Sequence, residues 1–74
     1  MTQNITKKLN IELNGAAVTV DDGVTLGELL DSRGLERRMI AVEYNGEILP
    51  RYDFDNTRIS DGDKLEVVHM VGGG

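Results

Sequence analysis

The chain has 74 residues and no cysteine, so we expect one small domain with neither a disulfide staple nor a thiolate zinc site. Its net charge of −5 argues against nucleic acid or an anionic membrane as a partner, because both attract a positive surface, and it suits a basic protein surface instead. No apolar run approaches the ~20 residues that span a bilayer. The first residues also lack the apolar segment of a secretion signal, so we expect a cytoplasmic protein.

The first two predicted strands, residues 7–15 and 16–23, form a hairpin around the turn signal Asn14-Gly15. Apolar side chains at every second position give each strand one face for the core, which is the pattern of a half-buried strand. The residues expected to point inward are Leu9, Ile11, Leu13, Val18 and Val20.

Residues 26–33 predict a short helix. Thr25 can cap its first turn, and Glu28, three residues later, completes a capping box. Gly34 follows at the position where a left-handed helix stop is expected, whereas Gly27 should weaken the helix slightly. The apolar stripe of this helix consists of Leu26, Leu29 and Leu30.

The remaining chain predicts a second hairpin over residues 39–49, a connection over residues 51–63 and a last strand over residues 64–71. The order of elements is therefore β-β-α-β-β-β, an α+β roll in which one helix covers one face of the sheet. The core residues expected in this part are Ile40, Val42, Leu49, Phe54, Ile59, Leu65 and Val67.

Three of the nine glycines are the last three residues, directly after the last strand. Glycine loses the most backbone freedom on ordering, so we expect a folded domain over residues 1–70 and a flexible glycine tail over residues 71–74. Fully extended, this tail reaches about 14 Å, and a thread without side chains could carry its carboxylate into another protein's active site. The same residues also fit an unselected flexible terminus or a cloning remnant.

Candidates for catalysis and metal binding are weak. His69 is the only histidine, and no nucleophile can be nominated to act with it. The aspartates around the glycines at 23 and 62 are typical of turns. Residues 53–64 resemble a calcium loop, but Arg58 and Lys64 occupy the positions of its glycine and its bidentate glutamate. We therefore predict no catalytic residue and no metal site.

Several segments together resemble the ThiS family, the ubiquitin-like (β-grasp) sulfur carriers of thiamin biosynthesis. These segments are "LNG", "TLGELL", "AVEYNGEILPR", "ISDGDKLEVV" and the terminal "VGGG", and they occur in the family's order over nearly the whole chain. The resemblance implies a β-grasp fold, with a mixed sheet of four to five strands packed on one helix.

The resemblance also implies a mechanism. The carboxylate of Gly74 would be adenylated by an E1-like partner of the ThiF type, which uses ATP and magnesium, and then converted to a thiocarboxylate. The sulfur would come from a donor such as a cysteine desulfurase and pass to a thiazole synthase of the ThiG type. Gly73 and Gly72 would let the tail enter the partner, and the carrier itself would bind no cofactor and would not be an enzyme.

The docking surface for these partners is expected on the outward face of the sheet, where apolar residues on a solvent face can mark a partner site. The residues expected there are Ala41, Val68, Met70 and Val71.

Five other functions remain open. The small subunit of molybdopterin synthase has the same fold and chemistry, although such carriers usually have a proline before the final glycines and this chain has only Pro50. Carriers for cysteine synthesis or tRNA thiolation share these features. A protein modifier would join Gly74 to a lysine, and an interaction module would have an inert tail.

Overall fold

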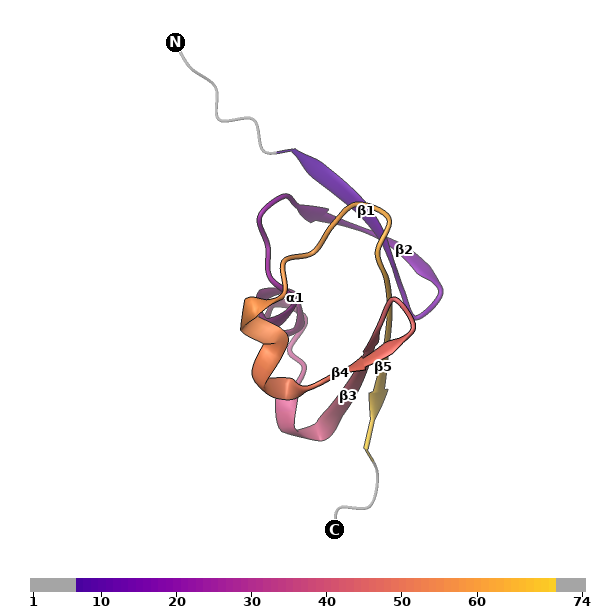
Figure 1. Cartoon of the computed structure of the whole chain (residues 1–74). Coiled ribbons are helices and arrows are strands. Elements are labelled where there is room, and N and C mark those ends of the chain that lie inside the picture. The colour runs from indigo at the N-terminus through magenta and orange to yellow at the C-terminus, as the bar shows by residue number, and fades with distance from the viewer. Residues whose placement is uncertain (1–6, 71–74) are drawn as a thin grey trace.

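The computed structural model of the chain describes residues 7–70. Within them, five strands form one sheet in the order β2-β1-β5-β3-β4, and a single α-helix lies across one face of it (Figure 1). This arrangement confirms the predicted β-grasp fold with its mixed sheet. The elements are β1 (Lys8–Leu13), β2 (Ala16–Asp21), α1 (Leu26–Ser32), β3 (Ile40–Tyr44), β4 (Glu47–Leu49) and β5 (Lys64–His69).

The last strand, β5, lies at the centre of the sheet. It runs parallel to β1, with Leu13 opposite Leu65, and antiparallel to β3, with Val42 opposite Val67. The two hairpins, β1–β2 and β3–β4, therefore form the two halves of the sheet, and β5 joins them. As a result, the segment that leads to the C-terminus follows a strand that has a neighbour on each side.

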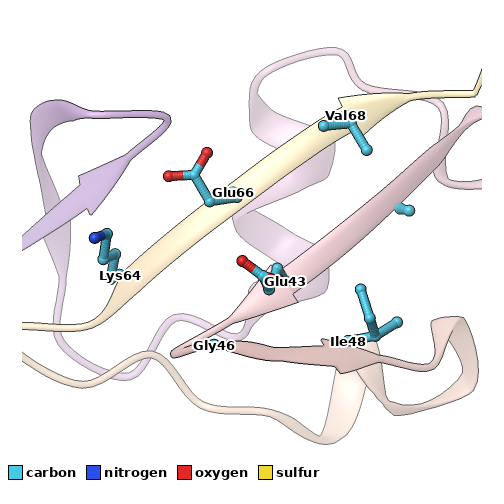
Figure 2. Close-up of a pocket in the computed structure, with 7 residues that line it drawn as sticks. Glu43, Gly46, Ile48, Lys64, Glu66 and Val68 are labelled. Atoms are coloured by element: carbon cyan, nitrogen blue, oxygen red, sulfur yellow. The ribbon is translucent and has the colours of Figure 1, made fainter.

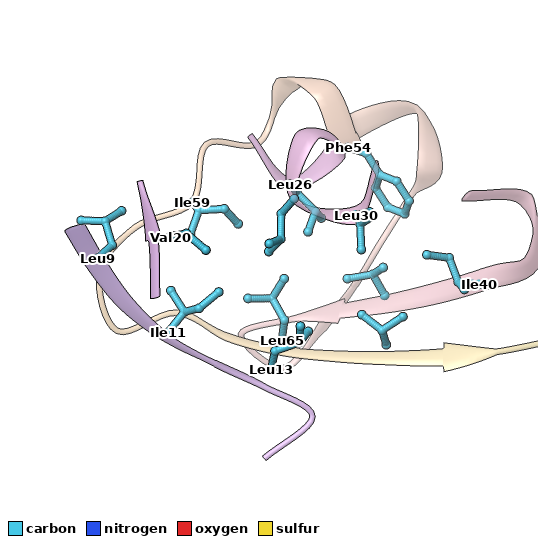
Figure 3. Close-up of a cluster of buried hydrophobic side chains, with 13 residues drawn as sticks. Leu9, Ile11, Leu13, Val20, Leu26, Leu30, Ile40, Phe54, Ile59 and Leu65 are labelled. Carbon is cyan, nitrogen blue, oxygen red and sulfur yellow. The ribbon is translucent and has the colours of Figure 1, made fainter. Parts of the chain in front are cut away.

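The core lies between the sheet and α1, together with the connection that follows β4 (Figure 3). Alternation in the strands and the three-leucine stripe of α1 supply one continuous apolar cluster, as the sequence predicts. Val18 and Leu49, which were expected inside, are half-buried at its margin. The buried members are Leu9, Ile11, Leu13, Val20, Leu26, Leu29, Leu30, Ile40, Val42, Phe54, Ile59, Leu65 and Val67.

The predicted turns and caps are confirmed. In both hairpins an asparagine and a glycine adopt positive φ, as a two-residue turn of this kind requires: Asn14 (50°) precedes Gly15 (82°), and Asn45 precedes Gly46. The capping box closes at the start of α1, where the Thr25 hydroxyl accepts from the Glu28 amide at 3.1 Å, and the Glu28 carboxylate accepts from the Thr25 amide at 2.9 Å.

The structure differs from the predictions in its connections. Two 3-10 turns, Arg37–Met39 and Arg51–Asn56, occupy segments for which the sequence predicted no regular structure or the start of a strand. The helix ends at Ser32, one residue before the predicted boundary, and Arg33 is its C-cap. No helix within residues 7–70 is long and apolar enough to cross a membrane.

Candidate functional site

The end of β5 brings the chain to the residues that the sequence singles out. Backbone hydrogen bonding continues to the last described residue, because the Met70 amide donates at 2.8 Å to the carbonyl of Met39, the residue before β3. The predicted site residues Val71, Gly72, Gly73 and Gly74 lie outside the described residues. Their expected roles, and the flexibility expected of the tail, stay predictions.

On the outward face of the sheet, the structure brings together two of the predicted docking residues. Ala41 and Val68 are direct neighbours across β3 and β5, and Val68 is 57% exposed. Met70 follows β5 directly and is about half exposed, at 48%. The outward orientation predicted for Val68 is therefore confirmed, whereas the docking role of both residues stays a prediction.

A shallow groove hollows this face, and we call it the outer groove (Figure 2). It contains two residues whose importance the sequence reasoning missed: Ile48 on β4, which is 69% exposed, and Glu43 on β3. Strict alternation from the inward Leu49 could have placed Ile48 outward. The residues that line the outer groove are Ala41, Glu43, Gly46, Ile48, Lys64, Glu66 and Val68.

A buried carboxylate fixes the start of β5. Asp63 accepts hydrogen bonds from the Tyr44 hydroxyl, from the Asn45 side-chain amide at 3.1 Å and from the Ser60 main-chain amide at 2.7 Å. Burial, together with the hydrogen bond to Asp63, raises the pKa of the Tyr44 phenol well above its ordinary value. The prediction that this aspartate serves a turn is confirmed, and its contacts also tie β3 to β5.

On the helical side of the molecule, Arg37 forms an exposed ion-pair cluster with two carboxylates. Its guanidinium donates to Asp31 at 3.0 Å and to Asp55 at 2.8 Å, and hydrogen bonding to Arg37 lowers the pKa of the Asp55 carboxyl. A Cβ atom at Gly27 would overlap the Asp55 carboxylate and lie 2.6 Å from the Arg37 Nη2 atom. Gly27 therefore makes room for this cluster, which the sequence reasoning did not anticipate.

Candidate catalytic groups remain scattered. His69 is exposed at the end of β5, opposite Ile40. Within residues 7–70, no three histidine or carboxylate side chains gather in a way that could hold a metal ion.

Comparison with known proteins identifies the family. The model of the ThiS family matches residues 8–74. The sulfur carrier protein ThiS of Bacillus subtilis is 38% identical over 65 residues, which cover 86% of this chain and 98% of that protein. The crystal structure of a thiamine biosynthesis protein (ThiS) from Geobacter metallireducens superposes with a TM-score of 0.75 at 38% identity, covering 89% of this chain and all of that one.

A third relative is much longer. A thiazole synthase of Paramagnetospirillum magneticum is 36% identical over 66 residues, which cover 89% of this chain but only 20% of that enzyme. One segment of a thiazole synthase is therefore similar to nearly all of this chain. The family predicted from the sequence segments is confirmed, and the chain belongs to the ThiS family, the sulfur carriers of thiamin biosynthesis.

Proposed function

We propose that this chain carries sulfur as a thiocarboxylate on Gly74 and donates it for thiazole formation. A carboxylate is a poor electrophile, so it must first gain a leaving group. A Gly74 carboxylate oxygen attacks the α-phosphorus of ATP, and pyrophosphate leaves. A sulfur nucleophile at the sulfide level then attacks the carbonyl carbon, and AMP departs with the bonding electron pair. A persulfide donor, such as that of a cysteine desulfurase, requires two further electrons from a thiol.

The observation that carries this proposal is that the family match extends through Gly74, so the three terminal glycines belong to the matched region. β5 leads into them from the centre of the sheet, where it is paired on both sides. A rigid base followed by a thread without side chains suits insertion into a partner's narrow site. Gly72 and Gly73 have the role of thread, and Gly74 that of sulfur acceptor.

The partners follow from what the carrier lacks. An adenylyltransferase of the ThiF type supplies the nucleotide site, the ATP and the magnesium, so the carrier need not itself be an enzyme. The proposed place of this reaction is the cytoplasm. A thiazole synthase of the ThiG type accepts the sulfur, and the presence of a similar segment within one thiazole synthase supports this pairing. Docking uses the outer groove, which Ala41 and Val68 line, together with Met70, which follows β5; Val71, the fourth expected docking residue, lies outside the described residues.

Intact-mass spectrometry of the protein purified from its own cells tests the proposal, with a Gly74-deleted form as the control. A species that is heavier by the exchange of one oxygen for sulfur, and that is absent from the control, is the expected result. If only unmodified protein appears, even after incubation with ATP, a sulfur donor and the activating enzyme, the carrier function is wrong. An adduct with a lysine of another protein would instead identify a modifier.

A further inference from the structure

Glu43 and Glu66 lie directly opposite each other at the centre of the sheet. Two other pairs in the same register are hydrogen-bonded. Asn45 and Lys64 lie two residues away in one direction, and Met39 and Met70 lie four residues away in the other. The Asn45 amide donates to the Lys64 carbonyl and the Met70 amide to the Met39 carbonyl, both at 2.8 Å. Hydrogen-bonded pairs recur at every second residue of an antiparallel ladder, so Glu43 and Glu66 also form one, with Cα atoms about 5.5 Å apart.

Both carboxylates line the outer groove, and Figure 2 shows them on the same face of the sheet. Like charges that face each other across two strands destabilise a sheet. The ion pairs within residues 7–70 involve Lys8 with Asp21 and Arg37 with Asp31 and Asp55, so none of them compensates Glu43 or Glu66.

The one cation on this part of the face does not neutralise the pair. Lys64 lines the groove two residues before Glu66. Its neighbour on the adjacent strand β1 is Glu12, which adds a third carboxylate. The centre of the face therefore carries three carboxylates and one ammonium group. This excess negative charge lies on the strands that also hold the apolar docking residues, so the free protein keeps an unfavourable arrangement at the place where a partner is expected.

The surroundings of the pair define what it can receive. Ile48, on the neighbouring strand β4, lies opposite Glu43. Two residues further along β3 and β5, Ala41 lies opposite Val68. Two adjacent carboxylates between exposed apolar side chains match a planar guanidinium, which can donate to both carboxylates while its stem covers apolar surface.

We propose that the Glu43–Glu66 pair receives an arginine side chain of the activating enzyme, and so makes the outer groove selective for a basic partner surface. This inference rests on the proposed function, because the activating enzyme must capture the carrier and release it for every sulfur atom. Opposite charges serve such a short-lived complex well, since they accelerate encounter and exclude wrong partners.

The test compares the double variant Glu43→Gln/Glu66→Gln with the wild-type carrier, using the purified ThiF-type activating enzyme of the same organism as the probe. Binding is measured at low and at high salt. At low salt we expect the Kd to rise about tenfold or more, mainly through slower association, and the wild-type salt dependence to flatten. The melting temperature of the free double variant should stay the same or rise by about 1–4 °C, because a repulsion is removed.

The matched control is Glu36→Gln/Glu47→Gln, which removes the same charge from two exposed residues outside the outer groove. If the Glu43/Glu66 variant binds like this control, or if it melts lower than the control does, the inference is wrong. The proposed function is judged separately, by thiocarboxylate formation on the wild-type chain, so either idea can fail without the other.

Discussion

The side chain of Asn14 pairs with the main chain of Val67 in the way that another strand residue would. Its Oδ1 atom accepts from the Val67 amide at 2.7 Å, and its Nδ2 atom donates to the Val67 carbonyl at 3.2 Å. The backbone of Asn14 has already entered the hairpin turn, at φ 50°. One asparagine therefore turns β1 and also extends its pairing with β5, three residues before the described chain ends.

Two substitutions at Asn14 separate these roles. Asn14→Ala loses both hydrogen bonds and, like the wild type, keeps a Cβ in the left-handed region, so we expect the free energy of unfolding to fall by about 1–2 kcal/mol. Asn14→Gly loses the same bonds but removes that Cβ, which should recover about 1 kcal/mol. Urea denaturation of both variants measures the difference. Equal stability of Asn14→Ala and the wild type would mean that the side-chain pairing contributes nothing.

The Tyr44 hydroxyl is expected to make stability depend on alkaline pH. Its pKa is raised in the folded protein, so its contribution is fully present below about pH 10, the pKa of an unfolded tyrosine, and is lost as the pH rises toward the folded value. Tyr44→Phe should lower the free energy of unfolding by about 1–2 kcal/mol at neutral pH and remove this alkaline loss.

Denaturation at neutral pH and above pH 10 checks this expectation. Tyr52→Phe is the matched control, because Tyr52 is 81% exposed. This substitution should leave both the stability and its dependence on pH unchanged. If Tyr44→Phe kept the wild-type alkaline loss, that loss would have to originate in another group.

Patterns that depend on neighbours in the sequence predicted most of this fold. The alternation in β1 correctly predicted that Leu9, Ile11 and Leu13 are buried in the core. The capping box correctly predicted where α1 begins. Both patterns act within a few residues of sequence. The central position of β5 was not predicted, since nothing in a strand of six residues states which strands will flank it.

The features that the sequence did not predict depend on contacts between distant residues. To predict that Glu43 and Glu66 lie opposite each other, one must know the register between β3 and β5. A hairpin turn, β4 and a long connection separate these strands in the sequence. Gly27 likewise looks like a weak helix residue until the fold brings Arg37 and Asp55 above it. The site could be predicted in part, because alternation shows which face Val68 occupies but not which residues of other strands lie beside it.

Gly27 provides a test of that contact. Alanine favours a helix over glycine by roughly 1 kcal/mol, but its Cβ would displace the Asp55 carboxylate from Arg37. We expect Gly27→Ala to change the melting temperature little in the wild-type chain. In an Arg37→Ala/Asp55→Ala background, which removes both side chains that this Cβ would meet, the same substitution should stabilise the protein by about 0.5–1 kcal/mol. A thermal double-mutant cycle measures this coupling, and additive effects would mean that Gly27 is not there to make room for the cluster.

The last prediction concerns Val68, which contributes exposed apolar surface at the end of the outer groove. Val68→Glu places a charge where a partner should cover an apolar surface, and desolvation of that charge should weaken binding to the activating enzyme about tenfold or more. The folded state should lose no more than about 1 kcal/mol, because the side chain already faces solvent.

Thiocarboxylate yield and partner affinity, measured on samples with matched melting curves, separate docking from folding. Tyr52→Glu is the control, since it adds the same charge at an exposed aromatic residue outside the groove. A normal yield from Val68→Glu would move the docking surface away from the outer groove. A low yield from both variants would mean that added negative charge anywhere on the carrier repels the enzyme, and that the groove has no special role.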